Sequence, residues 1–290
     1  MSAIIEIVLI GLFIGGVYGL LSLGLSIIFS GIRELLNIAH GHFALIGSYL
    51  AYLIIEKLRI DPLVLLPLIL LVSFCLGFAL QQGLLNKVVF KDPSVPIMML
   101  LGVALIIENT VLLIFSPDTK SLAPFVPYSL LTIKLWNINV PIIYLICFSI
   151  SIITILILYM FMKFTFIGRA IRATSENYEV SQGLGVNYKK IYAITFGIGS
   201  CMASLGGLLI GLLSSFNPSV GFNYLNLAFG AFILGGMGSI RGCLVGGIII
   251  GLVQSIASYY ISTTYAFFIS NVLILIVLAF RPQGLFGYKV

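Results

Sequence analysis

The chain has 290 residues, of which 60% are hydrophobic and only 8% are charged. Soluble domains carry about 25% charged residues, so this chain cannot cover a surface that faces water. A mean hydropathy of +1.19 over the whole length excludes a soluble enzyme, a disordered protein and a protein with a single membrane anchor. The composition therefore predicts a polytopic membrane protein, in which the net charge of +6 reports orientation rather than nucleic-acid binding.

A membrane span needs about 20 mostly apolar residues, and nine segments of the chain qualify as candidates. The second and the seventh are short and interrupted by glycine, which predicts broken or re-entrant segments. We therefore expect an all-α transmembrane bundle of about 8–9 spans that forms a single transmembrane domain over residues 1–290. In chain order the candidates are 4–30, 42–56, 62–86, 95–116, 140–162, 191–214, 225–240, 242–261 and 264–280.

The Lys and Arg residues predict the orientation in the membrane. If the polar segment 163–190 is cytoplasmic, alternation of the spans places eleven of the 15 Lys and Arg residues on that side, as the positive-inside rule requires. This arrangement puts the N-terminus outside and the C-terminus inside. The four cations on the outer side are Lys57, Arg59, Lys120 and Lys134.

An internal repeat relates two of the apolar segments. Residues 36–47 read LNIAHGHFALIG and residues 225–236 read LNLAFGAFILGG, with seven of twelve positions identical at one offset. The first copy enters from inside and the second from outside, which is typical of an inverted repeat whose broken helices line the central path of a transporter. The repeat predicts two related halves, about 1–116 and 191–290.

The sequence lacks the common motifs for nucleotide binding, metal binding and catalysis. It contains no GxxxxGK[ST] pattern for ATP, no HExxH, no GxSxG and no paired carboxylates, so we expect no cofactor in this chain. His40 and His42 are the only histidines and lie on different faces of a helix, so we expect no metal site. We expect both histidines to cap a helix end near the cytoplasmic interface.

Glu108 is the only carboxylate near the middle of a candidate span, and Asn109 follows it. Ionisable groups inside apolar spans are energetically costly and therefore point to function. Two interpretations stay open: Glu108 faces the permeation path, or it is a structural carboxylate hydrogen-bonded to another helix.

Glycines are concentrated between residues 235 and 251, in the sequence GGMGSIRGCLVGGIIIG. Their spacing fails the dinucleotide pattern GxGxxG. It predicts a non-helical turn at membrane depth, followed by a helix in which two GxxxG spacings let neighbouring backbones pack closely.

The polar segment 163–190 reads KFTFIGRAIRATSENYEVSQGLGVNYKK. Asn177 can cap a short helix over 178–184, which Gly183 and Gly185 can end. The segment is long for a connection in a compact membrane protein. It is either a solvated basic loop or a docking element for a soluble partner.

Four motifs, in order and at this spacing, make the sequence resemble the inner-membrane permeases of prokaryotic ABC importers for branched-chain amino acids. They are LNIAHGHFALIGSY at 36–49, GRAIRATSENYEVSQGLGVN at 168–187, LGGMGSIRGCLVGGIIIG at 234–251 and RPQGLFG at 281–287. The resemblance runs through nearly the whole chain. It implies a multi-pass protein of the prokaryotic plasma (inner) membrane, surrounded by lipid, that pairs with a second related permease. It also implies two cytoplasmic ATPases, which use the ATP, and an extracytoplasmic binding protein.

The resemblance also assigns residue roles. Segment 163–190 looks like the coupling loop of ABC importers, in which Glu-Ala-Ala is followed by Gly; Glu179 and Gly185 match, whereas Val180 and Ser181 replace the alanines. His42 stands where relatives often carry an acidic or small residue, and Glu108 where they often carry Gln. The expected ATPase-coupling residues are Arg169, Arg172, Glu179 and Gly185.

The sequence therefore predicts a permease subunit for leucine, isoleucine, valine or related hydrophobic amino acids, and no enzyme. One alternative is an ABC permease for urea, amides or a sugar, and another is a secondary transporter or channel that works alone. The expected translocation path contains Asn37, His40, Gly41, Glu108, Asn109, Asn226, Gly235, Gly236 and Gly238.

Overall fold

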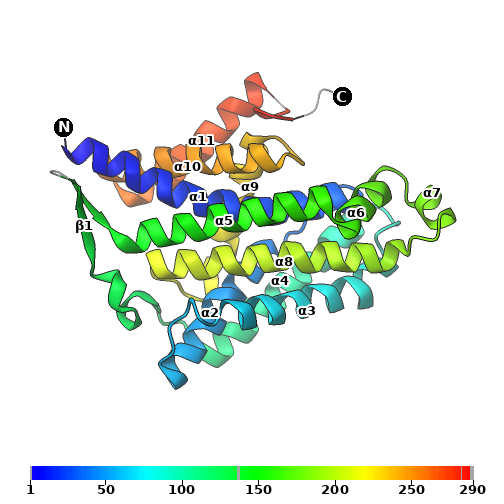
Figure 1. The fold of residues 1–290 in the computed structure, drawn as a ribbon, viewed down its shortest axis with the longest axis horizontal. Helices are drawn as coiled ribbons and strands as arrows, with labels where there is room; N and C mark the ends of the chain where they lie inside the picture. The colour runs from blue at the N-terminus through cyan, green and yellow to red at the C-terminus, as the bar shows by residue number, and fades with distance from the viewer. Residues whose placement is uncertain (1, 136–137, 282, 288–290) are drawn as a thin grey trace.

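The computed structural model describes residues 2–135, 138–281 and 283–287, and nearly all of the secondary structure in these ranges is helical (Figure 1). The α-helices are α1 (Ser2–Gly31), α2 (His40–Leu58), α3 (Leu66–Gly83), α4 (Ser94–Phe115), α5 (Ile142–Phe164), α6 (Phe166–Glu176), α7 (Tyr178–Gly183), α8 (Tyr188–Leu213), α9 (Gly221–Gly235), α10 (Ile240–Tyr260) and α11 (Thr263–Phe280). Four short 3₁₀ helices are η1 (Leu85–Lys87), η2 (Ala123–Phe125), η3 (Pro127–Ser129) and η4 (Pro218–Val220).

The described residues contain one pair of β-strands, a small hairpin before α5, and a single isolated antiparallel bridge between Lys120 and Phe216. The antiparallel strands of the hairpin are β1 (Thr132–Leu135) and β2 (Ile138–Pro141), with Thr132 opposite Pro141. The hairpin segment alternates β-branched and polar residues, a pattern that suits a strand pair.

Seven of the described helices are long and apolar enough to cross a membrane: α1, α3 with η1, α4, α5, α8, α10 and α11. The remaining two long helices are α2 and α9, which the sequence predicts to be short and interrupted. With 15 residues, α9 extends only about 22 Å, less than the roughly 30 Å of the bilayer core. The polytopic bundle is confirmed, whereas the expected number of 8–9 spans is not.

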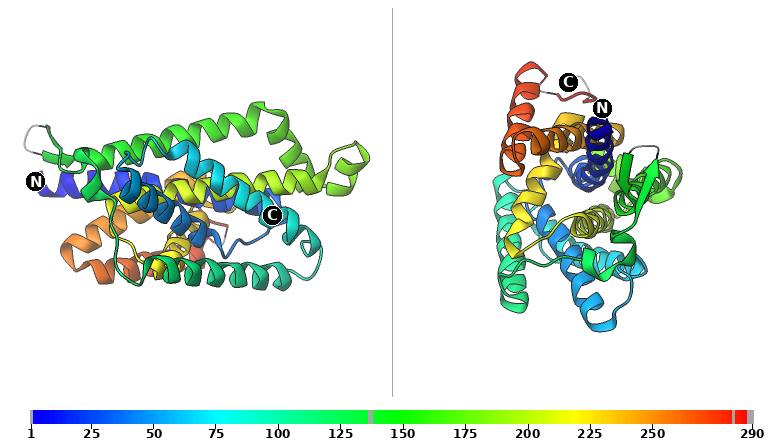
Figure 2. Two further views of the ribbon diagram at one scale, coloured as in Figure 1. Left: turned by 90° about the horizontal axis from the view of Figure 1, so that it is seen from below. Right: turned by 90° about the vertical axis from the view of Figure 1, so that its left-hand side faces the viewer.

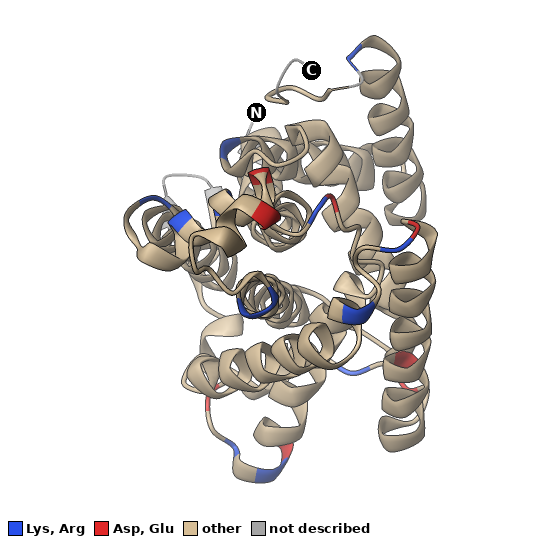
Figure 3. Cartoon of the chain, turned by 90° about the vertical axis from the view of Figure 1, so that its right-hand side faces the viewer, with Lys and Arg blue, Asp and Glu red and all other residues tan. Residues whose placement is uncertain are grey.

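The bundle has two distinct ends. In Figure 1, α1, α3, α5 and α8 run along the long axis, while α2 and α9 cross it obliquely. We call the end that holds α6 and α7 the α7 end, and the opposite end, with β1 and β2, the hairpin end. Figure 2 confirms that the N-terminus lies at the hairpin end. Figure 3 looks onto the α7 end, where the ribbon is coloured blue for Lys and Arg on several loops and helix ends.

Helix α8 forms the centre of the bundle, because 89% of its most apolar window is buried, against 17% for α4 and for α11. Its small residues allow α2 to pack backbone to backbone against it. Ser204 donates to the carbonyl of Phe43 at 2.7 Å, and Ser48 donates to the carbonyl of Gly207 at 2.7 Å. Each hydroxyl thus satisfies its hydrogen bond across the helix pair, as small polar residues do within membranes.

The glycines of the predicted GxxxG spacings lie on two faces of α10, one that packs on α1 and one that packs on α9. Gly247 and Gly251 lie against the α1 backbone at Gly15, where a Cβ atom on either would overlap it. Gly246 lies against the α9 backbone at Ala231. The structure has the predicted turn after α9 and the predicted helix with close backbone contacts after it. The depth of the turn in the membrane stays a prediction.

Helix packing in the two halves of the chain follows a matched pattern. Helix α1 packs along α10, and α8 packs along α3. Helix α2 packs on α8, α9 packs on α1, and α2 and α9 pack on each other. The two short helices therefore lie between the long ones: α2 is held mainly by α8 of the other half, and α9 is held both by α10 of its own half and by α1 of the other.

Candidate functional site

A side-chain hydrogen bond between α2 and α4 lies inside the bundle. The Nε2 atom of His42 is 3.2 Å from Oε2 of Glu108, and the exposed fractions of the two side chains are 0% and 21%. The His42 ring also meets the ring of Phe222 edge-on, with centroids 4.8 Å apart. The structure thus contains the hydrogen bond to another helix that one interpretation of Glu108 expects. The remaining exposure leaves part of the carboxylate accessible, so a role in the path stays a prediction.

The expectation that the two histidines cap a helix end is wrong. Helix α2 begins at His40, with Ala39 as its N-cap and no side-chain cap hydrogen bond. The Nε2 atom of His40 instead lies 2.9 Å from the carbonyl of Leu21 in α1. Both rings point toward neighbouring helices because α1 and α4 offer polar partners within reach. A ring in the first turn of α2 would have to fold back to reach the N-terminal amides.

The other expected path residues near α2 differ in their surroundings. Asn37 is fully buried, and among the described residues neither polar atom of its side chain has a hydrogen-bond partner. Gly41 lies so close to α9 that a Cβ atom would overlap the carbonyl of Gly221. Asn109 is exposed and donates to the carbonyl of Leu105 in its own helix at 2.8 Å. Asn226 is half-buried in α9.

The glycine turn after α9 lies apart from this group, at the α7 end. Gly236 and Gly238 have φ values of 100° and 83°, which L side chains rarely adopt. The backbone N–H groups of Leu285 and Phe286 donate to the last carbonyls of α9 at 2.9 and 3.0 Å. The segment 283–287 thus satisfies carbonyls that a helix end otherwise leaves unpaired, and the structure brings the turn together with the C-terminal RPQGLFG motif.

The segment between α5 and α8 contains two helices. Helix α7 has the expected N-cap, since Oδ1 of Asn177 accepts from the N–H groups of Glu179 and Val180 at 3.0 Å each. Gly185 follows with a φ of 87°, so the prediction of a capped short helix is confirmed. Helix α6 is a correction to the expected loop, and Thr165 caps it by accepting from the N–H of Gly168 at 3.1 Å.

The four expected coupling residues lie at or near the surface of the α7 end. All four residues, Arg169, Arg172, Glu179 and Gly185, are exposed. A guanidinium N–H of Arg172 donates to the carbonyl of Met162 at the end of α5, so Arg172 links α6 to α5.

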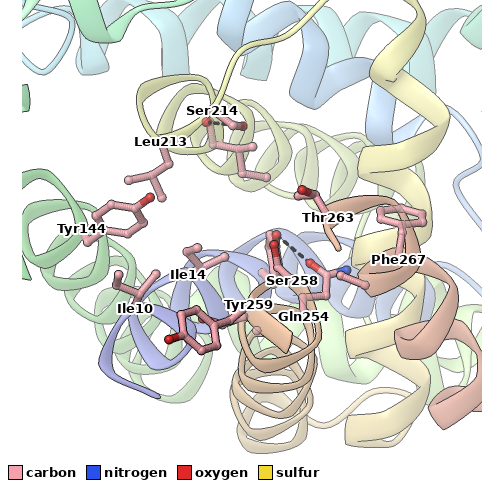
Figure 4. Close-up of a pocket in the computed structure, with 15 residues that line it drawn as sticks. Ile10, Ile14, Tyr144, Leu213, Ser214, Gln254, Ser258, Tyr259, Thr263 and Phe267 are labelled. Atoms are coloured by element: carbon pink, nitrogen blue, oxygen red, sulfur yellow. Dashed lines mark hydrogen bonds between the residues drawn. The ribbon is translucent and has the colours of Figure 1, made fainter. Parts of the chain in front are cut away.

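A cavity of about 580 Å³ opens near the hairpin end between α1, α5, α8, α10 and α11 (Figure 4). The Tyr18 hydroxyl donates to Oε1 of Gln254 at 3.0 Å, and the Gln254 amide donates to Ser270 at 3.2 Å. The lining residues carry no formal charge. Sequence reasoning missed this cavity because five helices contribute to it, and its strongest signal was a single Gln within an apolar segment.

The profile of a family described as branched-chain amino acid transport system / permease component matches residues 7–278. The chain belongs to this family. The permease is 28% identical to the high-affinity branched-chain amino acid transport system permease protein BraD of Pseudomonas aeruginosa, over 96% of this chain and 94% of that protein. It is 29% identical to the corresponding protein LivH of Escherichia coli K12, over 96% and 93% of the two chains.

A more limited similarity joins the permease to a sugar transporter. It is 31% identical to the ribose import permease protein RbsC of Haemophilus influenzae over 40% of this chain and 38% of that protein. No solved structure matches the permease. Among the described residues, no three His, Cys, Asp or Glu side chains gather as they would around a metal ion.

Family membership confirms several expectations from the sequence. The protein is a transport permease rather than an enzyme, and it is a multi-pass protein of the inner membrane. A permease component is one part of a transport system, so the protein acts together with other subunits.

Proposed function

We propose that this permease is one of two membrane subunits of an ABC importer for leucine, isoleucine, valine or related hydrophobic amino acids. The observation that carries the proposal is the full-length match to the family, together with relatives that are named for high-affinity branched-chain amino acid transport. The importer would contain a second related permease, two cytoplasmic ATPases and an extracytoplasmic binding protein. ATP would be used by the partner ATPases, and this chain would need no cofactor.

We propose that the translocation path follows the faces of α2, α4 and α9. Three features support this assignment: α2 and α9 are the two short oblique helices, they pack on each other, and the partly exposed Glu108 lies beside them. Irregular and polar elements at membrane depth are tolerated where they are buried in protein or line a wet cavity. The proposed lining is Asn37, His40, Gly41, Glu108, Asn109, Asn226, Gly235, Gly236 and Gly238.

The matched helix packing supports the proposed inverted repeat. If α1–α4 correspond in order to α8–α11, the pair α1 and α10 becomes the pair α8 and α3. The contact of α2 with α8 likewise becomes the contact of α9 with α1, and the contact between α2 and α9 maps onto itself. All these pairs pack in the structure. Repeat halves of about 1–116 and 191–290 would then form one domain of residues 1–290 around α2 and α9.

We propose that the segment 163–190 is the docking site for the ATPases. Helix α7 is a capped helix with an exposed surface, and Glu179 and Gly185 occupy the matching positions of the coupling motif. Leu184 is 81% exposed, an apolar side chain that a protein partner would cover. The eleven-to-four distribution of Lys and Arg supports a cytoplasmic location of this end.

Reconstitution tests the proposal. Proteoliposomes that contain this permease, its partner permease and the two ATPases, with binding protein outside and ATP inside, should accumulate L-leucine. Liposomes with a hydrolysis-deficient ATPase are the matched control and should show no accumulation. Uptake by the permease alone, driven by an ion gradient, would instead identify a secondary transporter. ATP-driven uptake of ribose without leucine would support the sugar alternative, which the partial similarity to RbsC favours.

A further inference from the structure

The chain turns sharply between α1 and α2. Arg33 and Glu34 follow the end of α1 with φ values of 45° and 57°, in the left-handed region. Residues other than glycine rarely adopt this conformation, and two in succession store strain in the backbone. The chain then passes through residues 35–39 into α2. The position of this turn therefore sets the position at which α2 begins.

The side chain of Arg33 reaches across the α7 end onto aromatic rings. Its guanidinium carbon lies 5.0 Å from the centroid of Phe90 and 5.5 Å from the centroid of Tyr178. These two rings are themselves 4.5 Å apart, and Tyr188 packs against both at 5.6 and 5.5 Å. We call Phe90, Tyr178 and Tyr188 the aromatic cluster. It joins the segment before α4, the start of α7 and the start of α8.

The aromatic cluster is linked to the proposed ATPase contact by one hydrogen bond. The hydroxyl of Tyr178 donates to Oε1 of Glu179 at 2.8 Å. This hydrogen bond raises the pKa of Tyr178, so the phenol stays protonated and remains a donor. Glu179 is the residue that matches the coupling motif. The side chain expected to meet an ATPase is therefore two contacts away from Arg33.

The segment between Arg33 and α2 contains a buried amide side chain, that of Asn37. Asn37 is fully buried, and its amide has no hydrogen-bond partner among the described residues. A buried polar group without a partner destabilises the conformation that holds it. Three residues later α2 begins, and it carries His42 with its contact to Glu108. A shift of the turn would move α2 and could give Asn37 a partner.

We propose that Arg33 is a positioning residue that transmits movement of α7 to α2, so that ATP hydrolysis in the partner subunits is tied to rearrangement of the path. The proposal rests on the proposed function of segment 163–190 as the ATPase docking site. It requires that Arg33 stays stacked on the Tyr178 ring while α7 moves, so that a movement of Tyr178 displaces Arg33.

The ratio of ATP hydrolysed to L-leucine imported tests this role, measured on the complete importer in proteoliposomes with its binding protein. Arg33→Gln and Tyr178→Leu should each raise the ratio by about two- to five-fold, the shift that an exposed cation–π contact can support. The double variant should be no worse than the more affected single one. Arg33→Lys keeps the cation and should restore much of the coupling.

Lys87→Gln is the matched control, because Lys87 is an exposed cation at the same end and should leave the ratio unchanged. Tyr178→Phe keeps the ring and removes only the hydrogen bond to Glu179, so an intermediate ratio is expected. This variant and Tyr178→Leu also keep the test decisive if Arg33→Gln does not fold, because Tyr178 lies at the surface of a short helix.

Copurification of the ATPases with the permease distinguishes a failure of the role proposed for Arg33 from a failure of the docking site proposed on segment 163–190. If the variants retain the ATPases and the wild-type ratio, or if the two single effects multiply in the double variant, the role of Arg33 is wrong while the docking site stands. If the unaltered permease binds its ATPases without any contact to α7, the docking site itself is wrong. A raised ratio with normal copurification, shared by both single variants and not increased in the double variant, supports the proposal.

Discussion

The Nε2 atom of His42 lies 3.2 Å from Oε2 of Glu108, and this contact joins the first turn of α2 to the interior of α4. Helix α4 otherwise packs mainly on α2 and η4 and is largely exposed. A charged carboxylate in mid-membrane costs at least about 2.5–3.5 kcal/mol. The contact with His42 offsets part of this cost, and it explains why Glu108 can stand in a span that contains no Lys, Arg or His of its own.

Substitution of Glu108 should separate hydrogen bonding from charge. Glu108→Gln keeps the size and an acceptor for His42, so assembly and most leucine transport should be retained. Glu108→Leu leaves the buried His42 without its partner, which costs about 1–3 kcal/mol, and transport should fall. Uptake assays on reconstituted complexes measure both, with Leu113→Ala as a control for the exposed surface of α4.

Two results would contradict this account of Glu108. Transport that is abolished by Glu108→Gln and depends steeply on external pH would mean that the charge itself is required, as in a proton-coupled carrier. Transport by Glu108→Leu at the unaltered rate would mean that Glu108 has no part in the path.

The glycines of α10 allow a stability test with an internal control. Gly247 lies against the α1 backbone, where a Cβ atom has no room. Gly247→Leu should therefore destabilise the purified permease by about 1–3 kcal/mol or more through overpacking. Gly102 in α4 has no atom of the described chain within 4 Å of the place where a Cβ would stand. Gly102→Ala should leave the thermal unfolding midpoint unchanged or slightly raised; equal losses in the two variants would contradict the packing described for α10.

Features that depend on neighbours in sequence were predictable. Asn177 and the glycines after it define α7 because a helix cap acts over three residues, and the nine apolar segments follow from local hydropathy alone. Helix α6 was missed because its sequence, FIGRAIRATSE, contains glycine and β-branched residues with low helix propensity; its cap at Thr165 and its packing on α5 and α8 stabilise it.

Features that depend on tertiary contacts were not predictable. His42 and Glu108 are 66 residues apart, and no pattern in either segment indicates the other. The roles predicted for the two histidines were wrong for the same reason, because their partners, the carbonyl of Leu21 and the carboxylate of Glu108, belong to other helices. The cavity at the hairpin end requires five helices at once.

A cysteine on α7 should report both topology and docking. Ser181 is buried and donates to the carbonyl of Asn177 at 2.8 Å, so the exposed Leu184 is the better position. In a background where the exposed Cys75 is replaced by serine, Leu184→Cys should cross-link to an ATPase subunit. It should resist an impermeant thiol reagent added to intact cells. Labelling from outside would refute the orientation and the docking site together.

The cap of α7 should matter for docking. Asn177→Ala removes two hydrogen bonds from the helix N-terminus, which costs about 1 kcal/mol, so residues 178–183 should exchange amide hydrogens faster and bind the ATPases more weakly. Asn187→Ala removes a similar cap from α8, but α8 is held by burial and should exchange as before. Unchanged exchange and unchanged ATPase binding in Asn177→Ala would show that the conformation of α7 does not depend on its cap.

Competition for uptake tests the central claim most directly. The complete importer with its binding protein takes up labelled L-leucine in the presence of ATP, and an excess of unlabelled isoleucine, valine, ribose or urea is added. Isoleucine and valine should suppress the uptake, whereas ribose and urea should leave it unaffected. Suppression by ribose or urea, or leucine uptake that persists without ATP, would contradict the assignment of this permease to an ABC importer for branched-chain amino acids.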